Sequence, residues 1–148
     1  MGYNIKILRI SLTYGPGASL NDNRVLNEMI ISGLKTKKIQ LLDQGKSVRK
    51  YLYINDCIEL IFNISKKSNK IIYNISGNSK LTIRDLAKII CKKTNSKLSF
   101  KKNNTAIKGA PNIVNVNNDR ICKEFKKLEY INILNGIDKT IKWYNLKI

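Results

Sequence analysis

The 148-residue chain contains no histidine, and this absence removes several classes of chemistry. Ser-His and Cys-His catalytic pairs and histidine-ligated metal sites all need an imidazole, so none of them can be built from this chain alone. Acidic residues are also few, with 10 Asp and Glu against 28 Lys and Arg. Hydrophobic residues nevertheless make up 43% of the chain, which indicates a globular protein of about one domain's size.

Cysteine is scarce and widely spaced. Cys57, Cys91 and Cys122 form no Cys-x-x-Cys pair, and an odd number cannot all pair in disulfides. We therefore expect buried thiols in a reducing cytoplasm. No apolar run approaches the roughly 20 residues of a membrane span. The N-terminus has no signal-peptide pattern either, so no membrane association is expected.

The formal net charge of +18 invites a nucleic-acid interpretation. However, lysine, asparagine and isoleucine are all abundant, with 23, 19 and 24 residues. Selection for nucleic-acid binding explains only the lysines, whereas a coding bias toward A/T-rich codons explains all three. Only five arginines supply the planar fork that suits phosphates and bases. Nucleic acid is thus not the expected partner, and a basic module for nucleic acid or another anionic surface is the alternative function.

Hydrophobic patterning predicts a mixed α/β fold. Residues 5–12 form an almost continuous apolar run, typical of a strand buried on both faces of a parallel sheet. Such a strand needs neighbours, and no strand pattern precedes it, so we expect an incomplete sheet. Further elements follow from the same patterning: strands at 39–42, 48–54, 70–75 and 97–100, and helices at 25–34, 55–64, 82–90, 118–128 and 134–146.

Polar residues before the predicted helices are candidate N-caps. We expect Asn21 or Asp22, Asn55 or Asp56, and Thr82 to take this role. Residues 101–114 have the composition of an exposed loop.

Two stretches carry more information than the rest of the chain, residues 8–17 and 42–56. The first is a strand ending in the turn Tyr14-Gly15-Pro16-Gly17, and open α/β folds bind ligands at the carboxyl ends of such strands. The second places Arg49 at the start of a strand, where its guanidinium could grip a diphosphate through two parallel hydrogen bonds. Taken singly, the first could be only a turn and Arg49 only a surface charge.

Together, in this order and about 35 residues apart, they resemble the C-terminal half of the nucleotide-sugar epimerase/dehydratase family, the extended short-chain dehydrogenases/reductases. The family pattern reads R-x-x-N-x-Y-G-P, then a helix, then G-x-G-x-x-R-x-x-x-Y-V-x-D. Later parts of the chain also resemble family motifs: Tyr-Asn-Ile-Ser-Gly at 73–77 with a helix over 79–90, Gly-Ala-Pro at 109–111, and the closing helix at 134–144.

The resemblance implies substrate-binding roles for five residues. Family members use the arginine matching Arg49 to bind the diphosphate of the nucleotide sugar. Arg24, beside Val25, matches a weaker substrate contact, and Lys108 matches a late-loop arginine that reaches the same phosphates. Tyr14, with the turn that follows it, would shape the pocket.

The chain also departs from the family pattern. Leu12 replaces the asparagine of R-x-x-N, which contacts substrate in many members, and Asp43-Gln44-Gly45 replaces G-x-G. Asp56 matches the retained aspartate, for which a helix cap is the plain alternative.

The sequence contains neither the G-x-x-G-x-x-G fingerprint that binds NAD(P) in this family nor its catalytic Tyr-x-x-x-Lys pair. The resemblance therefore implies that residues 1–148 are the C-terminal, substrate-binding portion of a Rossmann-like extended short-chain dehydrogenase/reductase, without its N-terminal NAD-binding part. One or two parallel strands and a small mixed α/β lobe are the expected architecture.

The implied function is nucleotide-sugar binding for an NAD-dependent epimerase, 4,6-dehydratase or decarboxylase. We expect no catalytic residue and no turnover in the chain alone, with NAD(P) bound only by a complete enzyme. The expected partners are a nucleoside-diphosphate sugar and either a separate N-terminal half or a second copy. A non-functional remnant with an open sheet edge is a third possibility.

Overall fold

The computed structural model describes residues 5–101, 111–127 and 129–148, in which a pair of short strands precedes each of the first three helices. The elements are β1 (Ile7–Ile10), β2 (Leu12–Tyr14), α1 (Val25–Lys35), β3 (Lys38–Leu41), β4 (Val48–Tyr53), α2 (Ile54–Lys67), β5 (Ile72–Ile75), β6 (Ser79–Thr82), α3 (Ile83–Thr94), β7 (Lys97–Phe100), α4 (Asp119–Phe125) and α5 (Ile133–Asn145). The α/β class predicted from the sequence is confirmed. None of the described helices is long and apolar enough to cross a bilayer.

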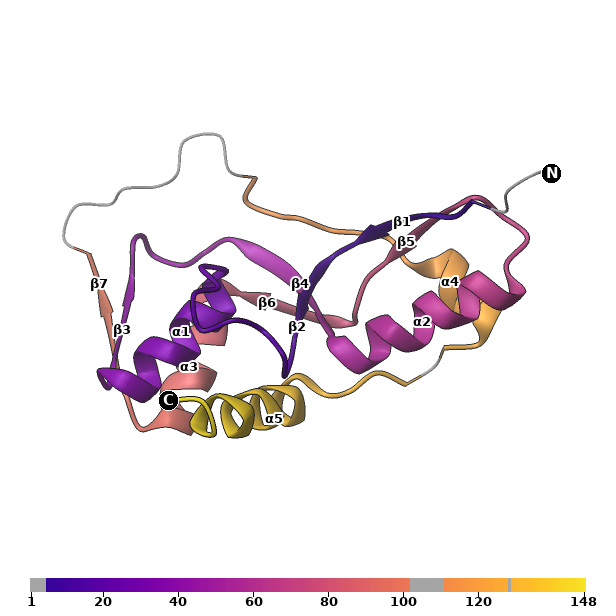
Figure 1. Cartoon of the computed structure of the whole chain (residues 1–148). Coiled ribbons are helices and arrows are strands. Elements are labelled where there is room, and N and C mark those ends of the chain that lie inside the picture. Colours follow the sequence, from indigo (N-terminus) through magenta and orange to yellow (C-terminus); the bar gives the residue numbers. More distant parts are fainter. Residues whose placement is uncertain (1–4, 102–110, 128) are drawn as a thin grey trace.

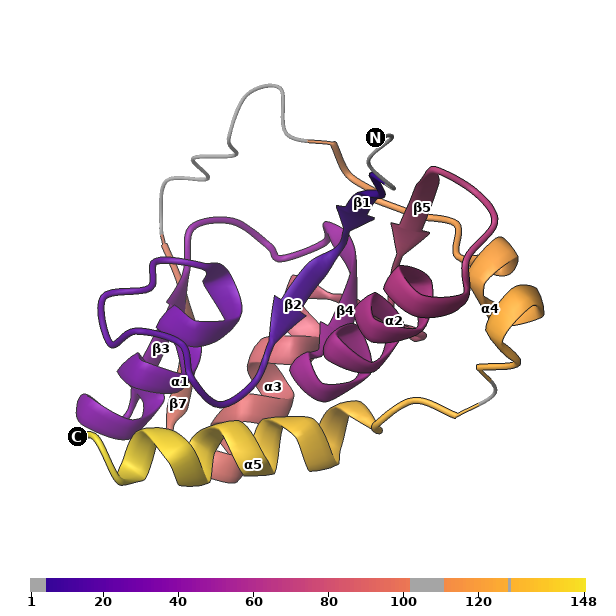
Figure 2. The same cartoon turned by 45° about the vertical axis from the view of Figure 1, so that its right-hand side comes forward.

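Strand pairing organises the molecule around β4. β4 pairs in parallel with β2 on one edge and antiparallel with β6 on the other. Two further parallel pairs, β1–β5 and β3–β7, lie on opposite sides of this three-stranded unit (Figure 1). Helices α1 and α3 lie beside β3 and β7, whereas α2 and α4 lie beside β1 and β5 (Figures 1 and 2).

The apolar run over residues 5–12 forms two short strands rather than one buried strand. β1 pairs with β5 and β2 with β4, and the change of partner occurs at Ser11, whose N–H donates to the Ile75 carbonyl at 2.8 Å. Ile7, Ile10 and Leu12 are 48%, 46% and 42% exposed, so the prediction of a strand buried on both faces was wrong. The reason is that, within the described residues, β5 is the only strand beside β1.

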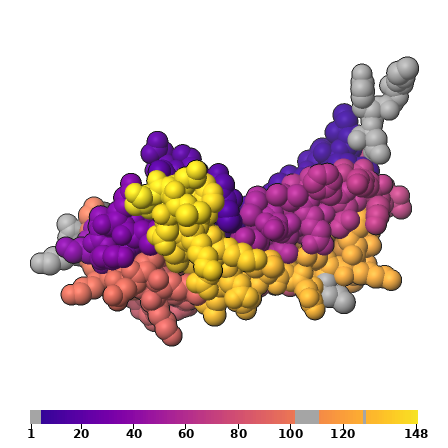
Figure 3. All heavy atoms as spheres, turned by 60° about the horizontal axis from the view of Figure 1, so that its bottom comes forward, coloured from indigo at the N-terminus to yellow at the C-terminus, as the bar shows by residue number. Residues whose placement is uncertain are grey.

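The core has two parts, and the alternation of side chains along β4 supplies both. Tyr51 and Tyr53 pack into a cluster with α1, β3, α3 and α5. Leu52 points to the opposite face and packs against α2, β5 and α4. Helix α5 contributes Ile137, Ile141 and Tyr144 to the first cluster. On the face shown in Figure 3 it lies between α1 and α3. One six-residue strand therefore joins both halves of the hydrophobic core.

The predicted caps had different outcomes. Thr82 caps α3, because its hydroxyl accepts from the Asp85 N–H at 3.0 Å, as predicted. Neither Asn21 nor Asp22 caps α1, whose N-cap position is Arg24 without a side-chain cap. Asp22 instead accepts from the Arg24 backbone N–H two residues later, at 3.0 Å.

Asp56 lies in the first turn of α2 and does not occupy the N-cap position, which belongs to Tyr53. Its buried carboxylate accepts from the Ile131 N–H at 2.9 Å and pairs with Lys127 at 3.0 Å. The cap prediction was wrong because this carboxylate bonds a segment 75 residues away instead of its own helix.

Other sequence predictions can be compared with the structure directly. Residues 79–82 form strand β6 instead of the first turn of a helix, because their backbone pairs with β4. All three cysteines are free; Cys57 is buried as expected, whereas Cys91 and Cys122 are partly exposed.

The turn after β2 and helix α5 meet at one close contact. Gly15 and Gly17 have φ of +147° and +99°, a region that favours glycine, as the Gly-Pro-Gly turn predicts. Tyr14, just before the turn, is 4% exposed. A β-carbon added to Gly136 of α5 would lie 2.9 Å from Cζ of Tyr14 and closer still to its hydroxyl. The absence of a side chain at Gly136 therefore makes room for the Tyr14 ring.

We predict that Gly136→Ala lowers the free energy of unfolding by about 1–3 kcal/mol, because overpacking displaces the Tyr14 ring. This loss should exceed the gain of about 1 kcal/mol in helix propensity from glycine to alanine. Urea denaturation is the measurement. Asn135→Ala, at an exposed position on the same helix, is the control; it gains helix propensity without a clash and should be neutral or slightly stabilising. A stabilised Gly136→Ala protein would show that the contact is not restrictive.

Candidate functional site

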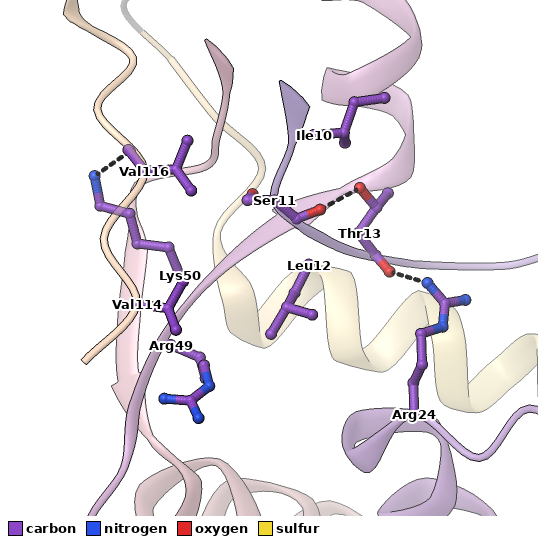
Figure 4. A pocket seen from close by; sticks show the side chains of 9 residues that line it. All are labelled: Ile10, Ser11, Leu12, Thr13, Arg24, Arg49, Lys50, Val114 and Val116. Carbon is purple, nitrogen blue, oxygen red and sulfur yellow. Dashed lines mark hydrogen bonds between the residues drawn. The ribbon is translucent and has the colours of Figure 1, made fainter. Parts of the chain in front are cut away.

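Two cavities lie side by side and share a wall. The larger, about 500 Å³, extends from the end of β2 past the start of α1 to β3 and β4. The smaller, about 430 Å³, lies between residues 10–13 and residues 114–116 (Figure 4). Four residues line both cavities and form the wall between them: Leu12, Thr13, Arg24 and Arg49.

The smaller cavity arises because β4 has two different neighbours along one edge. β2 pairs only with Tyr51–Tyr53. At the start of β4, Val48 bonds instead to a later segment, donating to the Asn112 carbonyl at 2.7 Å and accepting from the Val114 N–H at 3.2 Å. Lys50 extends along this segment to the Val116 carbonyl at 3.3 Å (Figure 4). The segment belongs to the predicted loop over 101–114, of which residues 102–110 lie outside the described residues.

Arg49 lies on β4, on the wall common to both cavities. Its guanidinium donates to the Val48 carbonyl at 2.9 Å and, more weakly, to the Asn112 carbonyl at 3.5 Å. Within the described residues it forms no ion pair with a carboxylate. Two backbone carbonyls thus orient a positive charge that an anionic ligand could neutralise.

Arg24 faces the same wall but is held by an acid. Its Nε donates to both oxygens of Asp22 at 2.9 and 3.0 Å, and a second guanidinium nitrogen donates to the Thr13 carbonyl at 2.9 Å (Figure 4). The hydrogen bonds from Arg24 lower the pKa of Asp22 to about 2 and, in return, raise the pKa of Arg24. This pair fixes the start of α1 against the carboxyl end of β2.

The structure brings four of the five predicted site residues to the larger cavity. Arg49, Arg24, Val25 and Tyr14 all line it, whereas Lys108 lies outside the described residues. Tyr14 contributes a buried wall, with its ring edge-on to Tyr53 at 5.6 Å between centroids. Burial raises the pKa of Tyr14 well above its ordinary value, which suits a neutral wall residue rather than a base.

Among the polar residues of the larger cavity that the sequence did not single out, two are buried. Asn27 of α1 and Tyr51 of β4 both line it, and they are only 1% and 4% exposed. Burial raises the pKa of Tyr51 to about 12. The strand period of two puts Tyr51 on the same face as Arg49, and this signal was available in the sequence. Asn27 could have been noticed as an amide on the apolar side of α1, between Leu26 and Met29.

No group of three potential metal ligands occurs among the residues that the structure describes. The cavity walls combine apolar side chains with arginine, hydroxyl and amide groups, with the carboxylates of Glu28 and Asp43 at the larger cavity and the ammonium group of Lys50 at the smaller one.

Comparison with known proteins gives consistent results. The model of the NAD dependent epimerase/dehydratase family matches residues 1–76. UDP-glucuronic acid decarboxylase 4 of Arabidopsis thaliana is 25% identical over 101 residues, which are 67% of this chain and 23% of that protein. UDP-glucuronic acid decarboxylase 1 of Xenopus tropicalis is 22% identical over 60% of this chain and 21% of its own length.

Solved structures with the same fold include two epimerases. UDP-glucose 4-epimerase from Thermotoga maritima superposes with a TM-score of 0.85 at 17% identity, covering 96% of this chain and 46% of that one. UDP-glucuronic acid 4-epimerase from Bacillus cereus gives 0.85 at 18% identity, with coverages of 98% and 46%. The matched region thus spans 23% and 21% of these two curated relatives and 46% of each of these structures.

The Asp22–Arg24 pair predicts a dependence of stability on pH. The pKa of Asp22 is lowered in the folded chain, so its stabilising effect is full above the ordinary value of 3.8 and is lost as the pH falls through about 2. We predict that Arg24→Ala raises this pKa, and that wild type and variant differ more in unfolding free energy at pH 6 than at pH 2. Carbon NMR of the Asp22 carboxyl and denaturation at both pH values test this; an unchanged pKa in Arg24→Ala would contradict it.

Proposed function

Because the chain belongs to the NAD-dependent epimerase/dehydratase family, we propose that it binds a nucleoside-diphosphate sugar and forms the substrate-binding portion of an epimerase, 4,6-dehydratase or decarboxylase. The observation that carries this proposal is the position of Arg49 on the wall between two cavities. A nucleotide sugar has the matching shape, with a doubly charged diphosphate between two different groups. Cavities of several hundred cubic ångströms are the ordinary size for such ligands.

The two cavities differ in a way that assigns the two ends of the ligand. The larger one has a buried apolar lining from Leu26, Met29, Ile39 and Leu41, which suits the flat faces of a nucleobase. The smaller one is lined by Ser11 and Lys50, which do not line the larger cavity, beside the apolar Ile10, Val114 and Val116. The hydroxyl and ammonium groups can hydrogen-bond the hydroxyl groups of a sugar. We therefore assign the nucleoside to the larger cavity and the sugar to the smaller one.

The diphosphate is assigned to Arg49, which offers a planar fork of donors. Arg24 contributes positive charge from the other side of the shared wall, although Asp22 already occupies much of its guanidinium. Val25 and Tyr14 complete the lining. Lys108 is proposed as a further phosphate contact on the resemblance alone.

The residues of this chain do not fit a dinucleotide cofactor. The glycine turn that follows β2 has the sequence Gly15-Pro16-Gly17, without the family fingerprint, and seven residues separate it from α1. The Arg24 N–H at the N-cap of that helix already donates to the Asp22 carboxylate and is therefore not available to a pyrophosphate. We propose that residues outside these 148 hold NAD(P) and supply the general base. A cytoplasmic location likewise stays a prediction.

A complete enzyme then needs a surface on which the two parts meet, and we propose β1 for it. Ile7 and Ile10 are 48% and 46% exposed, and β5 is the only described strand that pairs with β1. The occupant we propose is a parallel strand of an NAD-binding half, because the structural relatives are about twice as long as this chain. A second copy of the chain is the competing occupant, and its signature would be dimers of the isolated chain.

The first prediction of this proposal concerns affinity for UDP. Arg49→Ala should weaken UDP binding by about 10- to 100-fold, because charge-assisted hydrogen bonds contribute about 1.5–3 kcal/mol. Arg49→Lys should retain part of the affinity through charge without the planar fork. Isothermal titration calorimetry at fixed ionic strength is the measurement.

Arg9→Ala is the matched control, since Arg9 is exposed and lines neither cavity. It removes the same charge and should leave UDP affinity unchanged. Equal losses in both variants would indicate only the general field of a chain with a net charge of +18. If the chain bound duplex DNA with steep salt dependence and no UDP, the basic-module alternative would replace this proposal.

The second prediction concerns turnover. The purified 148-residue chain with NAD should not convert any UDP- or dTDP-sugar, whereas adding a polypeptide that carries the glycine fingerprint and Tyr-x-x-x-Lys should produce activity. Arg49→Ala in the mixture should reduce it, which ties the activity to this chain. Chromatography of the products is the measurement. Conversion of a nucleotide sugar by the isolated chain would overturn the assignment of catalysis to residues outside it.

A further inference from the structure

The larger cavity contains buried polar atoms without partners. Oδ1 of Asn27 and the hydroxyl of Tyr51 make no hydrogen bond within the described part of the chain, and both residues line this cavity. Leaving such a group buried and unpaired is costly, so native structures contain few of them. Five such atoms occur among the described residues, and these two are the ones whose residues line the larger cavity, so a ligand in that cavity is a candidate partner for both.

The orientation of the Asn27 amide is determined by a neighbour. Its Nδ2 donates to Oδ2 of Asp22 at 2.8 Å, and the same carboxylate holds Arg24. Because the amide nitrogen is committed to this acid, the atom of Asn27 that is left for a ligand is an acceptor. Asp22 can only accept hydrogen bonds when ionised, so flipping the amide would place oxygen against oxygen.

A buried acceptor on an apolar cavity wall selects a donor. Given the proposed function, on which this inference rests, the group in this cavity is a nucleobase. Uracil and thymine offer a ring N–H at N3, cytosine and adenine offer only an exocyclic amino group, and guanine offers both kinds of donor. Among these, the UDP-sugar relatives favour uracil. The geometry points to Asn27 as a specificity-determining residue: its Oδ1 accepts the N3–H of a uracil or thymine base, and the Tyr51 hydroxyl forms a second hydrogen bond to the same nucleotide.

The competing explanation is that these atoms bind the ribose, whose hydroxyl groups are also donors. The walls near Asn27 favour the base, because its neighbours Leu26 and Met29 are buried and apolar. The experiment below separates the two by changing the base and the ribose independently.

The test compares three ligands on the intact chain by calorimetry: UDP, UDP methylated at N3, and 2′-deoxy-UDP. The expected result is at least tenfold weaker binding of the N3-methyl compound, with 2′-deoxy-UDP within threefold of UDP. Equal affinities for UDP and the N3-methyl compound would overturn the inference. A loss with 2′-deoxy-UDP alone would overturn it in favour of the ribose.

Asn27→Ala separates hydrogen bonding from simple crowding by the added methyl group. This variant removes the acceptor and also makes room, so it should bind UDP about tenfold more weakly and no longer discriminate against the N3-methyl compound. Asn135→Ala, an exposed asparagine on α5 that lines neither cavity, is the matched control and should keep the full discrimination. Discrimination that persists in Asn27→Ala would show that Asn27 does not read the base.

In Tyr51→Phe the thermal midpoint and the affinity for UDP are expected to change in different ways. The hydroxyl has no partner in the unliganded chain, so its removal should leave the thermal midpoint unchanged or raise it. UDP affinity should nevertheless fall severalfold. Unchanged affinity would remove Tyr51 from the inference.

Failure of this inference and failure of the proposed function give different results. If wild type binds UDP in an Arg49-dependent way but does not discriminate at N3, only the role of Asn27 is wrong. If UDP does not bind at all, the proposed function fails and the inference fails with it.

Discussion

Strand β4 is bonded along both edges, and its second half, residues 51–53, is buried on both faces; the rest of the molecule is arranged by this constraint. One edge belongs to β6, and the other is divided between β2 and the segment at 112–114. One face supplies Tyr51 and Tyr53 to the larger core cluster, and the other supplies Leu52 to the second. The division of one edge leaves the smaller cavity, and the alternation of faces brings Arg49 and Tyr51 to the larger one. The same hydrogen-bond pattern that builds the fold therefore also builds the candidate site.

Asp22 has a comparable organising role on the opposite wall. Its carboxylate accepts from the Arg24 guanidinium, the Arg24 N–H and the Asn27 amide. This single acid fixes a cation at the shared wall and leaves an acceptor in the larger cavity. The chain has only 10 acidic residues for 28 basic ones, so Asp22 is one of few carboxylates available to orient a cation. An acid that orients a cation and an amide can define ligand chemistry without touching the ligand.

Sequence patterns predicted local structure well where one signal dominated. The Thr82–Asp85 spacing gave a helix cap, and the Gly-Pro-Gly turn gave two residues with positive φ. The pattern failed where tertiary partners decide. The apolar run at 5–12 has the composition of a buried strand, but its burial depends on neighbours that the pattern cannot supply. Asp56 has the sequence position of a cap, yet its partners lie 71 and 75 residues away. Arg49 and Arg24 could be chosen from motif order, whereas the pairing of Arg24 with Asp22 and the unpaired atom of Asn27 depend on side-chain geometry.

The unpaired state of Arg49 alone would be weak support for a ligand site in so basic a chain, because most cations here lack an acid. What distinguishes Arg49 is that two backbone carbonyls orient its guanidinium on a wall that two cavities share. A dispersed field of lysines attracts any polyanion without geometric preference, and salt screens it. An oriented guanidinium beside an apolar cavity instead selects an anion that carries a flat group at a fixed distance. The net charge therefore explains only general attraction of anions. Selective binding at the candidate site depends on which residue carries the charge.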